Sequence, residues 1–435
     1  MRFHLAPVFG CLAGFLIAQP AAAAVIISAI NTTSGGVLAN QLTSITGNTH
    51  LAGDSRLFLT TKSGRIGVYQ PTTDSFSTFL DLSSSVVGAS SNELGLLGLT
   101  FDPGYATNGY LYAYLTTRST PNGPVEAQVQ RFVDPAIASG PASTIWSMNL
   151  DGATNHVGGW IDFDKTGKLL IAIGDGGVSY ATDIRATGQN PSDWFGSILR
   201  IDPSVDSFPL DPLLNYDVPT DNPAIAGAAP EVFAYGVRNP FRNSVAPDGS
   251  LIIADVGQND REEITILGTG DPNRNLGWAL QEGDIATPAG GGPAPADYQA
   301  PDLVYEHSLG AAIIGGFVYR GSAVPELVGR YVFGDQRSGN IWSVIYSGGT
   351  FAPGTKQLLG NIPSLVSFGE TADGELVATR FTYGVAQIYG FSSDGVLPPV
   401  PEPASWAMMI AGLAMAGGLL RARSSFGFRA FRAAS

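Results

Sequence analysis

His156 stands between a polar asparagine side chain and a Gly-Gly pair, in the segment NHVGG. It comes just before a predicted strand, and Asp175 lies at the end of the same unit, in IGDGG. An imidazole can take a proton from a substrate when a carboxylate fixes its tautomer and stabilises the imidazolium. We therefore consider this pair a candidate general base with its orienting acid. The alternative is a loop histidine with no chemical task; His50 and His307 have no comparable setting.

Arg238 and Asn239 lie ahead of another predicted strand, in the segment GVRNPFRN. The guanidinium group presents a planar set of donors that suits carboxylates, and the carboxamide both donates and accepts hydrogen bonds. The two side chains are therefore candidates for binding an anionic ligand. An arginine that caps backbone carbonyls between repeats would give the same pattern.

Acidic residues crowd a glycine-containing turn after that strand, in DVGQNDREEI. They are Asp255, Asp260, Glu262 and Glu263. Carboxylate oxygens of this kind suit a hard cation such as Ca²⁺, although the spacing is not that of an EF-hand. An acidic surface loop is the alternative interpretation.

Six similar units must position these residues. Each has a turn with Gly, Asp or Asn, then an apolar or alternating strand, then another turn. Dipeptides such as DG, TG and NG supply the positive φ of tight turns, and segments such as KLLIAIG suit a pleated, half-buried surface. The units begin at Gly53, Gly95, Trp160, Asn243, Pro325 and Ser367. We predict an all-β fold, a six-bladed β-propeller, with a pair of β-sandwiches as the alternative.

The composition agrees with many short strands and excludes one class of partner. Of 435 residues 55 are glycine, and only 14% are charged, which does not suit long surface helices. The formal net charge of −14 argues against nucleic-acid binding, which needs a basic surface. An acidic chain is compatible with an extracytoplasmic protein that binds calcium.

The two ends of the chain differ from its body. Residues 1–24 have a positive charge, an apolar core and a run of alanines, which is typical of a secretory signal peptide. The lone Cys11 lies within it. We expect residues 25–397 to form the propeller and 398–435 to form a Pro-rich linker with a transmembrane sorting tail. The apolar stretch from Ala404 to Leu420 is at the short limit for a membrane span, and arginines follow it.

The tail resembles the PEP-CTERM sorting signal, because Pro401, Glu402 and Pro403 precede the apolar stretch and the arginines. That resemblance implies recognition by exosortase-type processing machinery, with exopolysaccharide as a further candidate partner. The expected location is the periplasm, the cell surface or the extracellular space, with transient anchoring in the membrane.

The body resembles the soluble PQQ-dependent sugar dehydrogenases, also called glucose/sorbosone dehydrogenases. The resemblance runs from about Leu51 to Phe391 through ELGLLGLTFDPGY, NHVGG…GKLLIAIGDGG, YGVRNPF, VGQNDREEI, NLGWAL and GGFVYRG…GRYVFGDQRSGNIW. It implies a six-bladed propeller that oxidises an aldose or related sugar with PQQ and calcium. His156 would deprotonate the sugar hydroxyl while hydride passes to the quinone, with Asp175 behind it and Glu93 near the cofactor.

The same resemblance assigns the remaining site residues. Arg238 and Asn239 would contact PQQ, and Arg337 lies near the position of a cofactor-binding lysine in the family. The main-chain carbonyls of Gly257 and Gln258 would hold the active-site Ca²⁺. Glu262 and Glu263 would serve a second, structural Ca²⁺.

One departure from the family leaves two functions open. The stretch PSLVSFGETADG lacks the family's Arg-x-Arg pair, so Arg238, Arg337 and Arg380 are the candidate partners for the PQQ carboxylates. The segments FGDQRSGNIW and SFGETADGEL also resemble hedgehog-interacting-protein-like propellers. The alternative to the enzyme is therefore a non-catalytic surface propeller that binds polysaccharide or protein. A calcium-dependent hydrolase or lactonase is a third, weaker interpretation.

Overall fold

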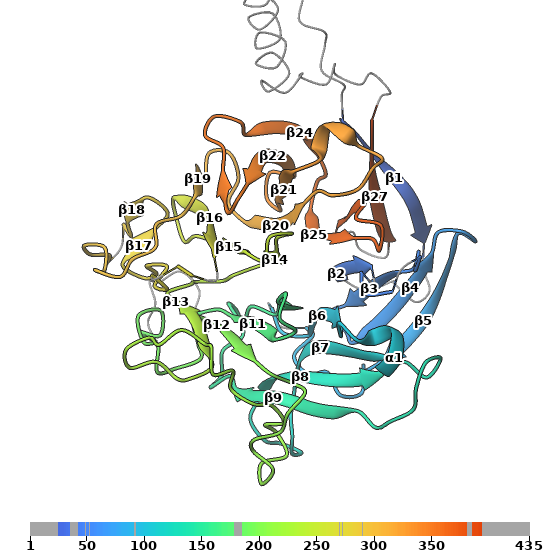
Figure 1. Cartoon of the computed structure of the whole chain (residues 1–435), viewed down its shortest axis with the longest axis horizontal. Helices are drawn as coiled ribbons and strands as arrows, with labels where there is room; N and C mark the ends of the chain where they lie inside the picture. Colours follow the sequence, from blue (N-terminus) through green and yellow to red (C-terminus); the bar gives the residue numbers. More distant parts are fainter. Residues whose placement is uncertain are drawn as a thin grey trace, which may run out of the picture. The chain divides into compact units, whose positions relative to one another are not determined.

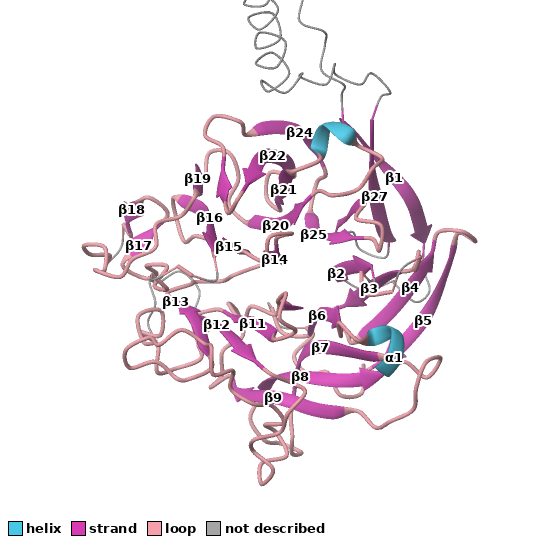
Figure 2. Ribbon diagram, viewed as in Figure 1, coloured by secondary structure: helices cyan, strands magenta, loops and turns pink. Residues whose placement is uncertain are grey.

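Six small antiparallel sheets are arranged in a ring about a common axis, as Figure 1 shows in the computed structural model. Two cavities are lined by strands or strand ends around this axis, which we call the central channel. The structure describes residues 25–393 apart from 35–41, 48, 52, 91–92, 178–184, 269, 272, 289 and 381–384. Nearly all regular elements are strands (Figure 2), which confirms the all-β, six-bladed propeller. The short α1 (Tyr105–Asn108) and a 3₁₀ turn at Pro325–Leu327 are the helical elements of the described residues.

Each blade presents one strand to the channel. These inner strands are β2 (Leu42–Gly47), β6 (Leu96–Phe101), β10 (Ile161–Phe163), β14 (Ser244–Val245), β20 (Ile313–Val318) and β25 (Leu365–Glu370). The second strands are β3 (Leu57–Thr61), β7 (Tyr110–Thr117), β11 (Leu169–Ile173), β15 (Leu251–Asp255), β21 (Arg330–Asp335) and β26 (Leu376–Arg380).

The outer strands complete the blades. They are β4 (Arg65–Gln70), β5 (Ser75–Asp81), β8 (Glu126–Val133), β9 (Ser143–Asn149), β12 (Ser197–Ile201), β13 (Val232–Tyr235), β16 (Arg261–Leu267), β19 (Leu303–Glu306), β22 (Asn340–Ser347), β23 (Thr350–Phe351) and β24 (Gln357–Asn361). A small hairpin, β17 (Gln281–Glu282) and β18 (Ile285–Ala286), stands beside the fourth blade. The six sequence repeats fall in six different sheets, one in each blade.

The last blade contains strands from both ends of the described chain. Its order is β1 (Val25–Ser34), β27 (Val385–Ser393), β26 and β25, so the first strand becomes the outer edge of the sheet that the last strands form. This pairing between the two ends of the described chain closes the ring of blades.

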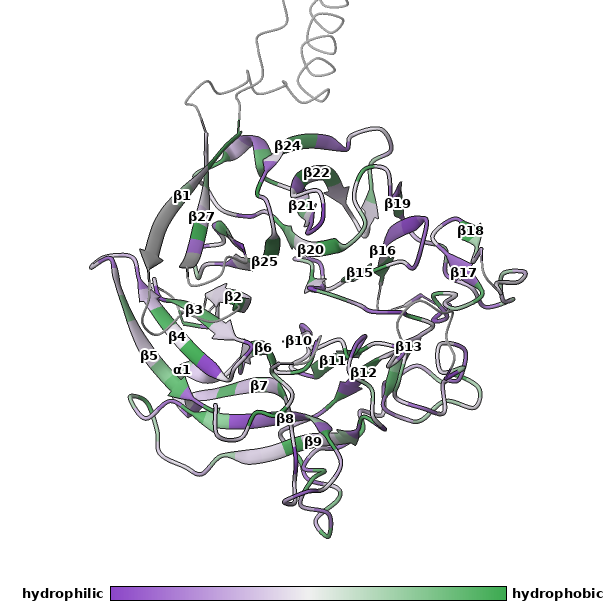
Figure 3. Cartoon of the chain, turned by 180° about the vertical axis from the view of Figure 1, so that it is seen from behind, coloured by the Kyte–Doolittle hydropathy of each residue, from purple (hydrophilic) through white to green (hydrophobic). Residues whose placement is uncertain are grey.

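Hydrophobic residues recur along the strands of the blades (Figure 3), and the buried ones form clusters that join neighbouring blades. Burial is nearly complete on the inner and second strands, as the fully buried β6 and β11 illustrate. Aromatic side chains fill the wider space between the outer strands, where Trp146 is fully buried against Trp194. The large, rigid rings fit the taper of a propeller, where blades diverge from the axis.

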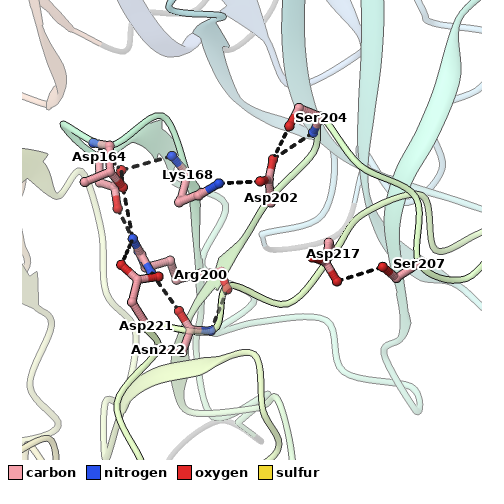
Figure 4. A network of polar contacts seen from close by, with 10 residues as sticks. Asp164, Lys168, Arg200, Asp202, Ser204, Ser207, Asp217, Asp221 and Asn222 are labelled. Atoms are coloured by element: carbon pink, nitrogen blue, oxygen red, sulfur yellow. Dashed lines mark hydrogen bonds and ion pairs between the residues drawn. The ribbon is translucent and has the colours of Figure 1, made fainter.

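A polar network holds the long connection between β12 and β13 against its blade (Figure 4). Arg200 on β12 donates to Asp164 at 2.7 Å and to Asp221 at 2.8 Å, and Lys168 pairs with Asp202. The Arg200 guanidinium is buried, so its two carboxylate partners offset the cost of removing its charge from water.

Candidate functional site

The propeller topology brings the predicted residues to one end of the channel. Each inner strand pairs antiparallel with the second strand, so its start lies beside that strand's end, as in Leu96↔Leu115 and Leu365↔Arg380. Residues just before an inner strand therefore meet residues just after a second strand. The predicted residues in these positions are Glu93, His156, Asp175, Arg238, Asn239, Gly257, Gln258, Arg337 and Arg380. We call this the site end of the channel, and the opposite end the far end.

His156 and Asp175 form a buried pair. The Nδ1 atom of His156 lies 2.7 Å from Oδ1 of Asp175, and the Asp175 side chain is 1% exposed. The second carboxylate oxygen accepts a hydrogen bond of 2.8 Å from the indole Nε1 of Trp278. Because Asp175 is an acceptor, the pair favours the tautomer with hydrogen on Nδ1, which leaves Nε2 with its lone pair. Sequence reasoning missed Trp278, which is 103 residues away in the chain.

The backbone around the histidine is shaped to hold this geometry. His156 has φ = 51°, a left-handed conformation that a residue other than glycine seldom adopts. A Cβ atom on Gly177 would lie 2.3 Å from Nδ1 of His156, so only glycine leaves room for the imidazole. Strained backbone beside a buried ionisable pair is typical of a functional site.

Glu93 links the histidine loop to the fourth blade. Its Oε2 accepts from the backbone N–H of His156 at 2.6 Å and from Nδ2 of Asn239 at 3.3 Å. Glu93 and Asn239 both line a cavity of about 260 Å³ at the site end. His156 is not among its lining residues, and the segment 178–184 after Gly177 lies outside the described residues.

Arg238 points toward the turn after β15. Its Nε donates to the Gln258 side chain and its Nη1 to the Val256 carbonyl, both at 2.8 Å, and the guanidinium lies 5.6 Å from the Trp278 ring centre. The backbone N–H groups of Arg238 and Asn239 each donate to Asp255 at 2.7 Å. Arg238 therefore joins the histidine pair to the predicted calcium turn.

That turn is built around a buried carboxylate that sequence reasoning also missed. Oε1 of Glu282 accepts hydrogen bonds from four successive backbone N–H groups, those of residues 258–261, at 2.7 to 3.1 Å. Donors that converge in this way hold a turn rigidly around a negative charge. The carbonyl oxygens of Gly257 and Gln258 accept no hydrogen bond from the described residues, which leaves them able to bind a hard cation.

Glu262 and Glu263 do not face one ion. They are consecutive on β16, so their side chains point to opposite faces of the sheet. Glu262 accepts from His307 Nε2 and from the Ile313 backbone N–H, both at 2.9 Å, whereas Glu263 accepts from Gly283. A single shared calcium therefore does not fit this pair. Within the described residues no cluster of three or more His, Cys, Asp or Glu side chains is arranged to hold a metal.

The setting of His307 differs from the prediction, because it has a buried carboxylate partner of its own. The Glu262 hydrogen bond raises the pKa of His307, and burial raises the pKa of Glu262 to about 7. The interaction crosses from β16 to the residues after β19. The two strands are neighbours in the fourth blade, but about 45 residues separate His307 from Glu262 in the sequence, so no local pattern marks the contact.

The predicted arginines differ in how they are placed. Arg337 is exposed just beyond β21, while its neighbour Gln336 lines the site-end cavity. Arg380 lies at the end of β26, and its buried Nε has no hydrogen-bond partner among the described residues. Two cations that the sequence did not single out, Lys62 and Arg242, also line the cavity. Burial lowers the pKa of both.

The residues at the site end fit a planar organic anion such as PQQ. Lys62 and Arg242 contribute positive charge to the cavity wall, against the single carboxylate of Glu93. The buried Oδ1 of Asn239 has no partner among the described residues and is free to accept from an N–H group of such a ligand. The two cations supply positive charge of the kind that the absent Arg-x-Arg pair would give, although they come from other blades. The free carbonyls of Gly257 and Gln258 equally fit calcium.

Comparison with known proteins finds a match for the body of the chain and another for its tail. The family model described as Glucose / Sorbosone dehydrogenase matches residues 47–379, and a PEP-CTERM protein-sorting motif matches residues 399–424. The motif, with the apolar stretch expected to cross a membrane, lies outside the described residues. Of the residues described here, no helix is long and apolar enough to span a membrane.

Curated relatives include a Hedgehog-interacting protein, a HIPL protein and a quinoprotein dehydrogenase. The human Hedgehog-interacting protein is 31% identical over 381 residues, which cover 81% of this chain and 50% of that protein. The HIPL2 protein of Arabidopsis thaliana is 27% identical over 79% of this chain and 58% of its own length. Quinoprotein glucose dehydrogenase B of Acinetobacter calcoaceticus is 23% identical over 52% of this chain and 48% of its own. The chain thus spans about half the length of these relatives.

Solved structures share the fold across nearly their whole length. The PQQ-bound aldose sugar dehydrogenase of Streptomyces coelicolor superposes with a TM-score of 0.64 at 19% identity, covering 87% of this chain and 100% of that one. The apo aldose sugar dehydrogenase of Escherichia coli gives 0.65 at 18% identity, covering 85% and 99%. At these identities the likeness shows the propeller fold.

Proposed function

The chain belongs to the glucose/sorbosone dehydrogenase family, and on that premise we propose that it is an exported oxidoreductase that uses PQQ and calcium to oxidise an aldose or related sugar. The observation that supports this most directly is the buried His156–Asp175 pair with Trp278 on its second oxygen. Asp175 from the same blade and Trp278 from the connection after β16 together keep the imidazole in one tautomer. A loop histidine with no task would not need that arrangement.

His156 acts as the general base in this proposal. PQQ, when bound, supplies the acceptor for the hydride that leaves the sugar carbon. His156 Nε2 takes the proton of the sugar hydroxyl, and its Nδ1–H remains donated to Asp175, which stabilises the imidazolium. Glu93 fixes the main chain of His156 through the 2.6 Å bond to its N–H, so the ring is oriented before the sugar arrives.

Cofactor binding falls to the groups around the same cavity. Lys62 and Arg242 would offset the carboxylate charge of PQQ, and Asn239 would hydrogen-bond to it. Further candidates for binding the PQQ carboxylates at the site end are Arg238, Arg337 and Arg380. The carbonyls of Gly257 and Gln258 would hold Ca²⁺, with Glu282 keeping their turn rigid.

The sorting motif supports processing outside the cytoplasm. The PEP-CTERM motif at residues 399–424 supports exosortase-type machinery as a partner, and the family match supports a sugar as the substrate. We propose the periplasm, the cell surface or the extracellular space as the location, with exopolysaccharide as a further partner. The body would reach that location after removal of residues 1–24.

A non-catalytic propeller is the second candidate, and two observations favour it. The relative that covers 81% of this chain at 31% identity is a Hedgehog-interacting protein, whereas the quinoprotein dehydrogenase covers 52% at 23%. The stretch before the last repeat's Asp-Gly lacks arginine. In this reading the channel end would bind polysaccharide or protein without redox chemistry.

Reconstitution separates the two candidates. The purified full-length protein is mixed with PQQ and Ca²⁺, and dye reduction is measured with a panel of aldoses. PQQ binding is followed separately by its absorbance and by calorimetry. The enzyme hypothesis expects micromolar or tighter PQQ binding and sugar-dependent dye reduction that His156→Ala abolishes.

A matched control guards against general damage to the propeller. Arg65→Ala removes an exposed ion pair with Asp81 on the rim of the first blade and should leave dye reduction unchanged. Absence of PQQ binding by a folded protein at saturating calcium would rule out the oxidoreductase and leave the binding propeller.

A further inference from the structure

The far end of the channel holds a second cavity of about 310 Å³, which the proposed oxidation does not use. The ends of the inner strands line it, including residues 44–47, 98–101, 161–163 and 367–370. Its size is at the lower end of the range for small-molecule sites. The sugar-oxidation site lies at the opposite mouth, so this cavity needs an explanation of its own.

Arg242 separates the two cavities. It belongs to the fourth blade, yet its Nη2 donates to the carbonyls of Thr43 in the first blade and Leu97 in the second, the latter at 3.0 Å. The side chain therefore crosses the channel, and it lines both cavities. Its Nε is buried without a partner, and no described carboxylate forms an ion pair with it. A buried guanidinium without a counter-charge is costly unless an anion approaches it.

Asn243 provides a second unused donor in the same wall. The residue is 1% exposed, and its Oδ1 accepts a hydrogen bond from the Ala254 N–H at 3.1 Å, which fixes the orientation of the amide. Its Nδ2 has no hydrogen-bond partner among the described residues. Buried donors in native proteins nearly always have an acceptor, so two unpaired donors at one cavity indicate a missing acceptor.

The charges around the far cavity favour an anion. Lys165, Arg242 and Arg320 contribute three positive charges to its wall, against the carboxylates of Asp162 and Glu370. Arg320 binds Glu370 in a bidentate pair at 2.5 and 2.7 Å, which neutralises both. Lys165 and Arg242 then face the single carboxylate of Asp162. This excess of positive charge stands out in a chain whose net charge is −14.

The rest of the wall suits a polyhydroxylated molecule. Hydroxyl groups of Ser44, Thr46 and Thr100 can exchange hydrogen bonds with sugar hydroxyls, and Trp160 offers an aromatic face of the kind that packs against sugar C–H groups. An inorganic anion would leave the aromatic part of this wall uncovered. The donors, the charge and the mixed wall together point to one ligand class.

We propose that the far cavity binds a sugar carboxylate, whose carboxylate group is held by Arg242 Nε and Asn243 Nδ2 and whose hydroxyls meet the Ser/Thr-lined wall. Two sources share this chemistry. One is a free aldonic acid, and the other is a uronic acid residue of an acidic saccharide. This cavity shares Arg242 with the proposed PQQ site, so sugar-acid binding is measured in the absence of PQQ.

Calorimetry on the full-length protein, without PQQ, tests this site. The probes are gluconate for the free acid and glucuronate for the uronic acid, with acetate and glucose as controls for the charge and the hydroxyls alone. We expect saturable one-site binding of at least one sugar acid, and binding at least about tenfold weaker for either control. The tighter of the two acids identifies the source.

Two isosteric variants locate the binding. Asn243→Asp keeps the acceptor for the Ala254 N–H but replaces the unpaired donor with a carboxylate oxygen, so affinity should fall by about tenfold or more. Asp162→Asn removes a carboxylate from the wall and should raise affinity several-fold. His156→Ala, at the other mouth, should bind the sugar acid like the unaltered protein, which separates this result from that of the oxidation assay.

Three outcomes would overturn the proposal. These are no saturable binding of either acid at millimolar concentration, binding that Asn243→Asp leaves unchanged, and acetate binding as tightly as the sugar acids. Circular dichroism and a melting curve for each variant establish that a loss of binding does not come from a loss of fold.

Discussion

Oδ1 of Asp175 lies 2.7 Å from the Nδ1 of His156, while its Oδ2 accepts from Trp278 at 2.8 Å, so one carboxylate fixes both an imidazole and an indole. Asp175→Asn would place an amide N–H₂ against one of these two donors. We expect dye reduction to fall by about 10³- to 10⁴-fold, because the imidazole loses its preferred tautomer. Steady-state kinetics with PQQ and Ca²⁺ measure the loss in kcat/KM.

Trp278→Phe tests the outer member of the same chain of hydrogen bonds. It removes the indole donor and leaves Oδ2 of Asp175 unpaired in a buried position. Activity should fall by about tenfold, with a smaller effect on the melting temperature. An unchanged kcat/KM in a folded variant would show that Trp278 does not orient the pair.

Gly177→Ala tests the space beside the imidazole. The added methyl group would lie 2.3 Å from Nδ1 of His156, so the ring has to move. A displacement of about 1 Å costs about 10²-fold in rate when the group is catalytic. Kinetics should therefore show a large loss in kcat while the melting temperature changes little. Gly270→Ala, in the connection after β16, serves as the comparison because its φ is not left-handed and the added methyl group meets no other atom within 4 Å beyond its chain neighbours.

Asp162 should make the stability of the propeller depend on pH. Burial raises the pKa of this carboxyl from 3.8 to about 6; Glu370 adds to the increase, while the hydrogen bonds from Phe163 and Thr100 and the charge of Lys165 oppose it. Between these values the folded state holds a proton that the unfolded chain releases, so the free energy of unfolding falls as the pH rises through that window.

Asp162→Asn removes this titration and keeps the acceptor for the Thr100 hydroxyl and the Phe163 N–H. Above pH 6 the variant should be more stable than the unaltered protein by roughly 1–3 kcal/mol, and near pH 4 the two should be similar. Urea unfolding between pH 4 and 7.5 measures the difference. Parallel pH profiles for the two proteins would contradict the assignment.

Glu282→Ala removes the acceptor shared by four backbone N–H groups of residues 258–261. Unfolding free energy should fall by roughly 3 kcal/mol, because buried donors lose a charged partner. If Gly257 and Gln258 hold calcium, the variant should also need more Ca²⁺ for the same dye reduction. Glu306→Ala is the control, since that side chain is 65% exposed on the adjacent strand and should change little.

Local sequence patterns were sufficient for the fold and for part of the site. Turn dipeptides and apolar strands repeat in every blade, and they predict the six sheets without knowledge of their neighbours. His156 and Asp175 were found together because they flank one hairpin, β10–β11. Contacts between blades leave no such trace. Trp278 reaches Asp175 from a connection 103 residues on, and Arg242 reaches Thr43 across 199 residues.

The acidic turn shows the other limit of sequence reasoning. Glu262 and Glu263 look like a pair of ligands in the sequence, but strand geometry turns them to opposite faces. The carboxylate that organises the turn is Glu282, which comes from a separate hairpin beside the blade. The sequence shows that acidic residues are abundant, but only the arrangement of the blades determines which acidic side chains lie close together.

Strand β1 joins β27 within the last blade, so residues 25–34 must wait for residues 385–393 before the ring exists. Contacts of such long sequence separation form late and slowly. Until β27 has formed, β1 would leave backbone N–H and C=O groups without partners, and these groups could pair with strands of other unfolded copies of the chain. Aggregation during folding is therefore most expected just after translocation, before the last blade is complete. A chaperone that assists this protein should bind the amino-terminal strand and cover its free edge.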